Sequence, residues 1–413
     1  MAWGESLPEG RGAAVLAACA LLLPAVALGQ AASPVSPFVE EKIVHDDNVF
    51  RLSRDTDPTP LLGTAARSDT YRITSAGLNL DLPVSRQRFV ANLSAIDSRY
   101  DRFSQLDYTG HDLRATWLWQ AENNASGQLG YVNSAALASF ANIAGTAPDI
   151  LKTQQAFFNG TYLASPRWRI HAGADDYQQR NGNPAQQVND VDIVDGEVGL
   201  SYLTPKESSL GESSLGFSVR GESGRFPVQQ PVGAILVDNA YRQYRAGFVA
   251  DWPVTAASHL SGRIDHVNRS YDQVPQRDFN GTTARLQYDW KPTAKIGLTA
   301  LAQRDLSPFE YVRSSFVLVK GITLRPTYSV TSKIDLSGSF DRVTREYLGD
   351  PSAALGVTPS RIDKVHSLGA LLTYRALQTV TLQLSAVHET RSSNIAFGDY
   401  AANVVFLSGR LAF

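Results

Sequence analysis

Apolar side chains recur at every second position in many segments of about ten residues, from residue 38 to the end of the chain. In the stretch Ala284–Trp290, for example, Ala284, Leu286, Tyr288 and Trp290 alternate with arginine, glutamine and aspartate. A period of two predicts strands with one apolar face and one polar face. We find no helical period after the N-terminal region, so the sequence predicts an all-β fold, either a sandwich or a barrel.

The alternation predicts eighteen strands. They span residues 38–50, 69–82, 87–97, 111–120, 126–133, 154–163, 167–176, 193–203, 214–222, 242–252, 259–268, 282–290, 296–304, 314–325, 333–342, 364–375, 379–388 and 404–413. The count becomes sixteen if segments 38–50 and 126–133 are not strands. An even count places both chain ends on the same side of an up-and-down antiparallel barrel, as in bacterial single-chain outer-membrane barrels.

The N-terminus carries one apolar run, Ala13–Gly29, which is too short for a spanning helix. Its end, Ala27–Gly29, fits the small-x-small cleavage rule, so residues 1–29 are predicted to be a secretory signal peptide. Residues 30–413 then form a single barrel domain. A lipoprotein signal ending at Cys19 is rejected because the apolar run continues past it. Removal of the peptide takes away the only cysteine, so the mature chain has no disulfide.

The connections between the strands fall into two classes, and this favours a membrane barrel over a sandwich. Long polar connections span 177–190, 226–239 and 346–361, and between them lie short ones at 83–87, 165–167, 253–259, 291–295 and 376–379. Outer-membrane barrels have short periplasmic turns and long external loops. A Greek-key sandwich has no reason to sort its loops in this way.

Aromatic residues lie close to the short connections. The set comprises Trp117, Trp119, Trp168, Trp252, Trp290, Tyr202, Tyr328 and Tyr374. Aromatic rings favour the membrane–water interface, where one end is apolar and the other is hydrated. The sequence therefore predicts a periplasmic aromatic girdle, whereas ordinary core tryptophans would not follow loop length.

The chain ends in the alternating strand VVFLSGRLAF, whose last apolar residues are Leu411 and Phe413. In a barrel this strand pairs with the first one and leaves no open sheet edge. A terminal phenylalanine on such a strand resembles the signal read by the outer-membrane barrel assembly machinery. We therefore expect Sec-type secretion followed by insertion into the outer membrane of a Gram-negative cell, with outer-membrane lipid around the barrel.

If the apolar phase of the strands faces lipid, the opposite phase faces an aqueous lumen. We expect the lumen wall to include Arg169, His171, Asp175, Asp195, Glu197, Arg220, Glu222, Arg245, Asp251, Arg263, Asp265, Arg285, Asp289, Arg375 and Arg410. Both signs of charge occur, and an eighteen-stranded barrel is wide enough for a channel. The alternative is that these charges pair across strands and only keep the lumen hydrated.

The sequence offers no signal for catalysis or for a cofactor. It contains no G-x-S-x-G elbow, Walker A loop or H-E-x-x-H motif, and its seven histidines form no pair with metal-ligand spacing. The formal charge of −2 shows no excess of basic residues that would indicate binding to nucleic acid. We therefore predict no enzyme, no metal and no nucleic-acid partner.

The stretch PFVEEKIVHDDNVFRL at residues 37–52, the proline-marked short turns and the last strand resemble one family in layout. They are similar to the EpsL-type outer-membrane β-barrel porins of exosortase-associated exopolysaccharide operons. The motif-like part is Asp46–Leu52. The resemblance implies export of an exopolysaccharide through a passive conduit that works with periplasmic and inner-membrane export components.

Four functions compete at this point. The leading hypothesis is an exopolysaccharide-export channel, and the alternative is a general or solute-specific porin for small hydrophilic solutes. A structural barrel or surface-polymer anchor would have a lumen closed by inward-folded loops. An outer-membrane lipid hydrolase would need a serine–histidine pair near one rim, and no convincing pair is present in the sequence.

Overall fold

The computed structural model describes residues 34–142, 145–204, 211–232, 234–307, 316–348 and 360–413. The predicted signal peptide and Cys19 lie outside these residues, so the predicted division of the chain into peptide and barrel stays a prediction. No helix in the described ranges has the length and apolar character needed to cross a bilayer.

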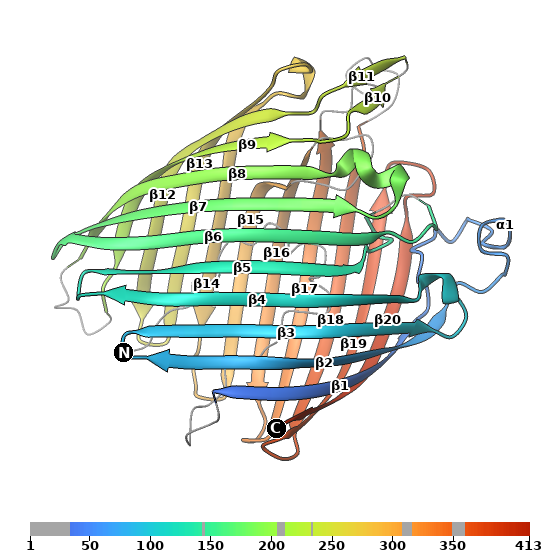
Figure 1. Ribbon diagram of the computed structural model, residues 1–413, viewed down its shortest axis with the longest axis horizontal. Coiled ribbons are helices and arrows are strands. Elements are labelled where there is room, and N and C mark those ends of the chain that lie inside the picture. Colours follow the sequence, from blue (N-terminus) through green and yellow to red (C-terminus); the bar gives the residue numbers. More distant parts are fainter. Residues whose placement is uncertain (1–33, 143–144, 205–210, 233, 308–315, 349–359) are drawn as a thin grey trace.

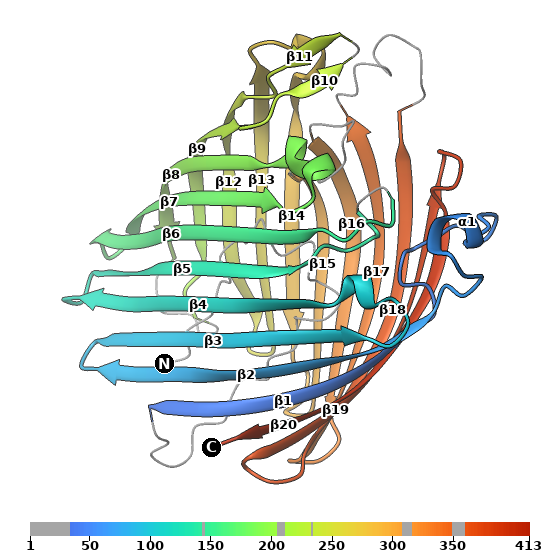
Figure 2. The same cartoon turned by 45° about the vertical axis from the view of Figure 1, so that its right-hand side comes forward.

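The described residues form one closed antiparallel barrel of eighteen strands, seen in Figures 1 and 2. Consecutive strands pair around the wall, except that the hairpin β10–β11 stands apart and β9 pairs with β12. The wall strands are β1 (Val35–Asp46), β2 (Asp69–Val84), β3 (Gln87–Tyr100), β4 (Tyr108–Ala121), β5 (Ala125–Leu137), β6 (Ile150–Ser165), β7 (Trp168–Asn181), β8 (Val191–Leu203), β9 (Ser214–Arg225), β12 (Tyr241–Thr255), β13 (Ser258–Tyr271), β14 (Phe279–Trp290), β15 (Ile296–Ser307), β16 (Phe316–Ser329), β17 (Ile334–Leu348), β18 (Ile362–Arg375), β19 (Val380–Ser393) and β20 (Tyr400–Ala412).

The barrel closes between its first and last strands. β1 pairs with β20 from Phe38 opposite Ala412 to Asp46 opposite Val404. All eighteen predicted strands are therefore present, and the alternative of sixteen is wrong. Closure satisfies the backbone groups of both edge strands, which a spanning sheet in lipid requires.

One rim carries the long connections and the remaining elements, and we call it the mouth. They are α1 (Thr59–Leu62), the 3₁₀ turns η1 (Ser104–Leu106), η2 (Pro184–Asn189) and η3 (Pro275–Arg277), and the strands β10 (Gln230–Val232) and β11 (Ile235–Val237). Figure 1 shows α1 and the β10–β11 hairpin projecting from this rim, with the C-terminus away from it. The predicted sorting is confirmed for the long connections at 177–190 and 226–239 and for the predicted short turns, whereas most of the predicted connection 346–361 lies outside the described residues. The prediction that 226–239 is only a loop is wrong, because it contains the hairpin.

The two faces of the wall have different chemistry. The outward face carries large exposed apolar side chains, among them Val198, Phe248, Leu368 and Leu407. The inward face carries most of the charged residues, although Val44, Leu371 and Phe406 form a small apolar cluster there. Apolar groups in contact with acyl chains lose nothing by being outside the wall, so the barrel needs no continuous apolar core.

The aromatic residues predicted to form a girdle lie on the outward face near the short turns. Trp168 packs edge-on against Tyr202 at 5.4 Å between ring centroids. Trp117 stacks on Phe89 at 6.0 Å across β3 and β4. Leu411 and Phe413 also point outward at the end of β20 and are exposed. Their predicted roles at the periplasmic interface and in assembly stay predictions.

Candidate functional site: the barrel lumen

All fifteen side chains predicted to line the lumen share the inward face. Cross-strand register links them: Asp175 lies opposite Asp195, Glu197 opposite Arg220, Arg220 opposite Arg245, and Arg263 opposite Arg285. The face is inward because Arg263 on β13 reaches Glu197 on β8, past β9 and β12. Such a contact is available only on the concave side of the wall.

Six of these residues form one charged cluster, which we call the wall network: Asp195, Glu197, Arg220, Arg245, Arg263 and Asp265. Arg263 binds Glu197 at 2.9 Å and Asp265 at 2.6 Å. Arg220 binds Asp195 at 2.7 Å, and Arg245 lies 3.7 Å from Asp265. Arg220 and Arg245 lie directly opposite each other, but each arginine of the cluster has an acid within 4 Å that offsets its charge.

Two further residues extend the wall network at its ends. His171 on β7 lies 3.5 Å from Glu197, and its ring lies over Gly199, where any Cβ would collide with the imidazole. Arg245 also donates to Asp305 on β15 at 3.0 Å. The network therefore runs from β7 to β15 and covers one side of the lumen.

A second inward cluster lies nearer the mouth around Glu222. Its carboxylate accepts hydrogen bonds from the Tyr241 hydroxyl at 2.6 Å and the Gln243 amide at 3.0 Å, and Arg269 lies 3.5 Å away. The guanidinium of Arg269 also lies 4.0 Å from the centre of the Tyr241 ring. We predicted Glu222 alone. The other three could have been found by continuing the inward phase along β12 and β13.

The remaining predicted residues do not gather into one site. Asp175 accepts a hydrogen bond from Gln155, Asp251 pairs with His259, and Asp289 accepts a hydrogen bond from Thr299. Three arginines bind acids on other segments: Arg169 with Glu212, Arg375 with Asp335, and Arg410 with Glu40. Arg285 makes no ion pair with any other described residue. The lumen wall is thus largely neutralised by local pairs, with Arg285 as a cation open to the lumen.

The mouth is narrowed by three loops that pack together. Their buried apolar residues form the mouth cluster: Val49, Phe50, Phe103, Leu106, Ala138, Phe140 and Leu151. Phe50 is the centre, with its ring 4.9 Å from that of Phe103 and 4.7 Å from that of Phe140. The cluster joins the β1–β2, β3–β4 and β5–β6 connections. None of these aromatic residues was singled out from the sequence, because they stand outside the alternating segments.

The β5–β6 connection also reaches across the barrel. The Ala141 carbonyl accepts a hydrogen bond at 2.5 Å from Arg391 on β19, and the Asn142 side chain accepts one at 3.3 Å from Arg345 on β17. Strands β4, β3, β2, β1 and β20 separate β5 from β19 along the wall. At the far end of the same connection, burial raises the pKa of the Asp149 carboxyl. Protonation of Asp149 therefore favours the packed loop.

The motif-like stretch Asp46–Leu52 fastens the seam between β1 and β20 at the mouth. The Asn48 amide donates to the carbonyls of Leu52 and Ala401, and its oxygen accepts the Leu52 N–H at 2.9 Å. Asp47 accepts both the backbone and the side-chain N–H of Asn403. The carboxylate of Asp46 accepts from Arg51. These turn residues end β1 at Asp46, so the predicted extension of this strand to residue 50 is wrong.

We expect the substitution Asn48→Ala to weaken this seam. It removes three hydrogen bonds and leaves the Ala401 carbonyl without this donor, which should lower the free energy of unfolding by about 2 kcal/mol. Urea denaturation of the purified barrel in detergent, followed by tryptophan fluorescence, measures the change. Asn92→Ala, which breaks a single bond to Asn79 on the wall, is the matched control. An equal loss for both variants would contradict a special role for the seam.

The same 3₁₀ loop is built twice at the mouth. The segments YDRFSQLDY at 100–108 and YDQVPQRDF at 271–279 share tyrosine, aspartate, glutamine and aspartate at the same spacing. In both, the last aspartate accepts the N–H of the first tyrosine: Asp107 from Tyr100 at 2.8 Å and Asp278 from Tyr271 at 2.9 Å. This internal repeat is visible in the sequence and predicts that the two loops share one geometry, which the alternation of the strands does not indicate.

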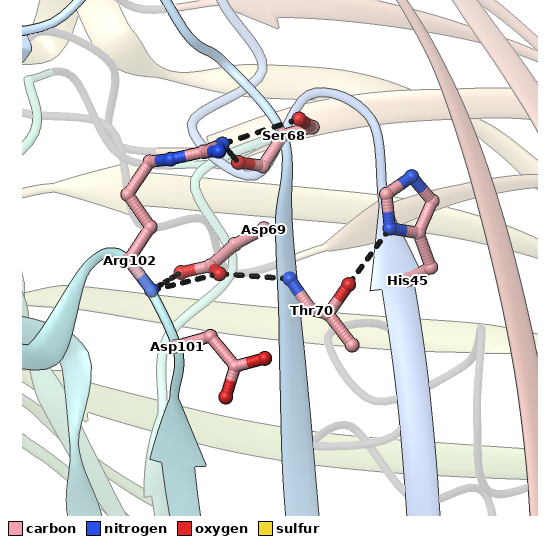
Figure 3. Close-up of a pocket in the computed structure, with 6 residues that line it drawn as sticks. All are labelled: His45, Ser68, Asp69, Thr70, Asp101 and Arg102. Carbon is pink, nitrogen blue, oxygen red and sulfur yellow. Dashed lines mark hydrogen bonds between the residues drawn. The ribbon is translucent and has the colours of Figure 1, made fainter.

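A cavity of about 350 Å³ lies beside the first of these loops, outside the lumen. Figure 3 shows the residues that line it: His45, Ser68, Asp69, Thr70, Asp101 and Arg102. Asp69 accepts the backbone N–H groups of Thr70, Arg102 and Phe103 at 2.7, 3.0 and 2.8 Å. These bonds anchor the β3–β4 loop to β2, so the residues around the cavity have a structural role. In the ranges that the structure describes, no three His, Cys, Asp or Glu residues are placed to hold a metal ion.

Comparison with known proteins finds a family match in the second part of the chain. Residues 253–413 match the family model described as "Putative beta-barrel porin 2". No curated protein matches the chain in sequence. Together with the closed barrel, the family match supports a porin-type barrel, and this barrel lies in the outer membrane of a Gram-negative cell, as predicted.

Several solved structures are similar at low identity. OpdK of Pseudomonas aeruginosa with vanillate is 9% identical, with 92% of this chain and 99% of that chain covered and a TM-score of 0.49. OccK2 of the same organism is 9% identical, with 92% and 98% covered and a TM-score of 0.49. OccAB3 of Acinetobacter baumannii is 11% identical, with 92% and 98% covered and a TM-score of 0.46.

Proposed function

We propose that this outer-membrane barrel is a porin through which small hydrophilic solutes diffuse. The observation that carries the proposal is the pairing of a charged, inward-facing wall with a mouth narrowed by packed loops. A neutralised but polar wall keeps a hydrated solute solvated along the whole passage. The contacts of Ala141 and Asn142 with Arg391 and Arg345 reduce the opening from the full width of the barrel.

Export of an exopolysaccharide, which the family resemblance implies, receives less support. The stretch Asp46–Leu52 that carries the resemblance serves the seam of the wall, since its side chains bind backbone groups of β20 and of their own turn. A polymer in transit would also have to displace the mouth cluster. Recognition of Leu411 and Phe413 by the assembly machinery, and partnership with export components, remain predictions.

Liposome swelling with the purified full-length barrel tests the proposal. We expect mono- and disaccharides to enter at rates that fall steeply with size, while a linear polysaccharide stays outside. Passage of the polymer at a rate comparable with that of a disaccharide would favour export. A folded barrel that admits no solute would favour a structural barrel or anchor and would refute the porin.

Arg285 should set part of the ion preference. Arg285→Glu changes the lumen charge by two at a position with no described counter-charge, directly opposite Arg263. We expect the ratio of cation to anion permeability to rise about four-fold, because a two-unit change of charge roughly 8 Å away, screened at about 0.15 M salt, acts in opposite directions on cations and anions. The reversal potential in a salt gradient measures this ratio. Arg242→Glu, whose side chain faces outward on β12, is the control and should leave it unchanged. An unchanged ratio for Arg285→Glu would place this residue outside the conducting path.

A further inference from the structure

The outward face of four neighbouring strands changes from apolar to cationic at one level. Toward the mouth, Ile322 on β16 is followed by Lys320, Phe340 on β17 by Arg342, Leu368 on β18 by His366 and then Lys364, and Ala386 on β19 by His388. The apolar side chains below this level include some of the most exposed on the molecule. A change at the same depth on adjacent strands marks the boundary between acyl chains and head groups.

The basic residues at this boundary form a patch, which we call the cationic patch: Lys320, Arg342, Lys364, His366 and His388. Arg342 lies directly opposite His366, and Lys364 follows two positions along the same face of β18. Directly opposed side chains have Cβ atoms about 5 Å apart, so the side chains of Arg342, His366 and Lys364 can converge on one group. The threonines Thr344 and Thr390 lie opposite Lys364 and His366 and add hydroxyl donors.

The patch has little counter-charge among the described residues. On the outward faces of β16 to β19 the described acid is Glu346, which binds Lys320 at 2.6 Å. Arg342 and Lys364 make no ion pair with another described residue, and both are exposed. Two arginines elsewhere on this outer surface are paired: Arg99 binds Asp97 at 2.6 Å and Arg180 binds Asp192 at 2.5 Å.

We propose that the cationic patch binds the phosphate of a phosphorylated glycolipid in the outer leaflet. The mouth faces the outside of the cell, since long loops are external in outer-membrane barrels. A lipid phosphate at the head-group level binds the guanidinium of Arg342 and the ammonium of Lys364. The hydroxyls of Thr344 and Thr390 donate hydrogen bonds to its sugar. The patch thereby fixes one glycolipid against β17 and β18.

The test uses the purified full-length barrel and a fluorescent lipopolysaccharide as the probe. The double variant R342Q/K364Q should bind it about 25-fold more weakly, at about five-fold for each cation removed. The control R99Q/R180Q removes two arginines from the same outer surface that are already paired with acids, and it should keep the affinity within about two-fold. Heat-modifiable mobility on gels verifies that each variant is folded.

Two competing lipids complete the test. The same glycolipid after phosphatase treatment should compete weakly, and equally weakly for the wild type and R342Q/K364Q. Wild-type affinity in R342Q/K364Q, or equal competition by the dephosphorylated lipid, would overturn the proposal. Equal competition by phosphatidylglycerol would assign the patch to phospholipid head groups and would overturn the glycolipid as its ligand.

Discussion

The substitution Phe140→Ala should raise the single-channel conductance of the barrel. Phe140 is 6% exposed and fills the side of the mouth cluster that continues into Ala141 and Asn142. Removing a buried phenyl ring costs about 3–5 kcal/mol of local stability. That loss is large compared with the two hydrogen bonds that hold the connection to Arg391 and Arg345. We therefore expect the β5–β6 connection to leave the mouth and the conductance to rise by a factor of about two or more, as packing is lost.

Conductance in planar lipid bilayers is the measurement for Phe140→Ala. Leu61→Ala is the control, because Leu61 lies on α1 at the same rim, is 52% exposed and is not part of the mouth cluster. It should leave the conductance unchanged. If the Phe140 variant is folded and still conducts as the wild type does, the loops at the mouth do not limit the flow, and the narrowest point lies deeper in the lumen.

The substitution Asp265→Asn should be the most destabilising single change in the wall network. Asp265 is 2% exposed and binds Arg263 at 2.6 Å, with Arg245 at 3.7 Å. The change removes the acid that the two guanidinium groups share. Arg263 then keeps Glu197 and Arg245 keeps Asp305, in a buried site where water cannot replace the lost charge. Breaking a buried ion pair by removing one partner costs about 3–5 kcal/mol.

Urea denaturation of the barrel in detergent measures the loss for Asp265→Asn. Asp251→Asn is the matched control, because Asp251 lies on the same inward face but pairs with His259 at a half-exposed position. Exposed pairs contribute about 0–1 kcal/mol, so this variant should stay close to the wild type. A similar loss in both variants would mean that the wall network is hydrated and gives no special stability.

The period-two pattern predicted every wall strand, but it placed several strand ends too early. β17 continues to Leu348 and β19 to Ser393, each several residues beyond the predicted end. Toward the mouth the outward phase becomes polar, as at Arg342 and His388, so the alternation stops although the hydrogen-bond ladder continues. The alternation of apolar and polar residues extends only as far as the apolar layer on the outward face. The length of a strand is set instead by its backbone hydrogen bonds.

The sequence predicts which side chains face the lumen, but it does not predict which of them contact one another. Parity along each strand places Glu197 and Arg263 on one side of the wall. Their contact past β9 and β12 depends on the curvature of the closed barrel, which no local pattern encodes. The mouth was unpredictable for another reason. Phe50, Phe103 and Phe140 stand in three connections that are far apart in sequence, and only their packing identifies them.

The seam brings together residues from the two ends of the described chain, since Asp47 and Asn403 are 356 positions apart. Every strand from β1 to β20 must therefore be translated before the cylinder can close. Until then both terminal strands expose unsatisfied amide and carbonyl groups, which makes the incomplete sheet prone to aberrant pairing with other chains. Closure is accordingly expected to be the final and slowest event of maturation, because contacts of such high sequence separation carry the largest entropic cost.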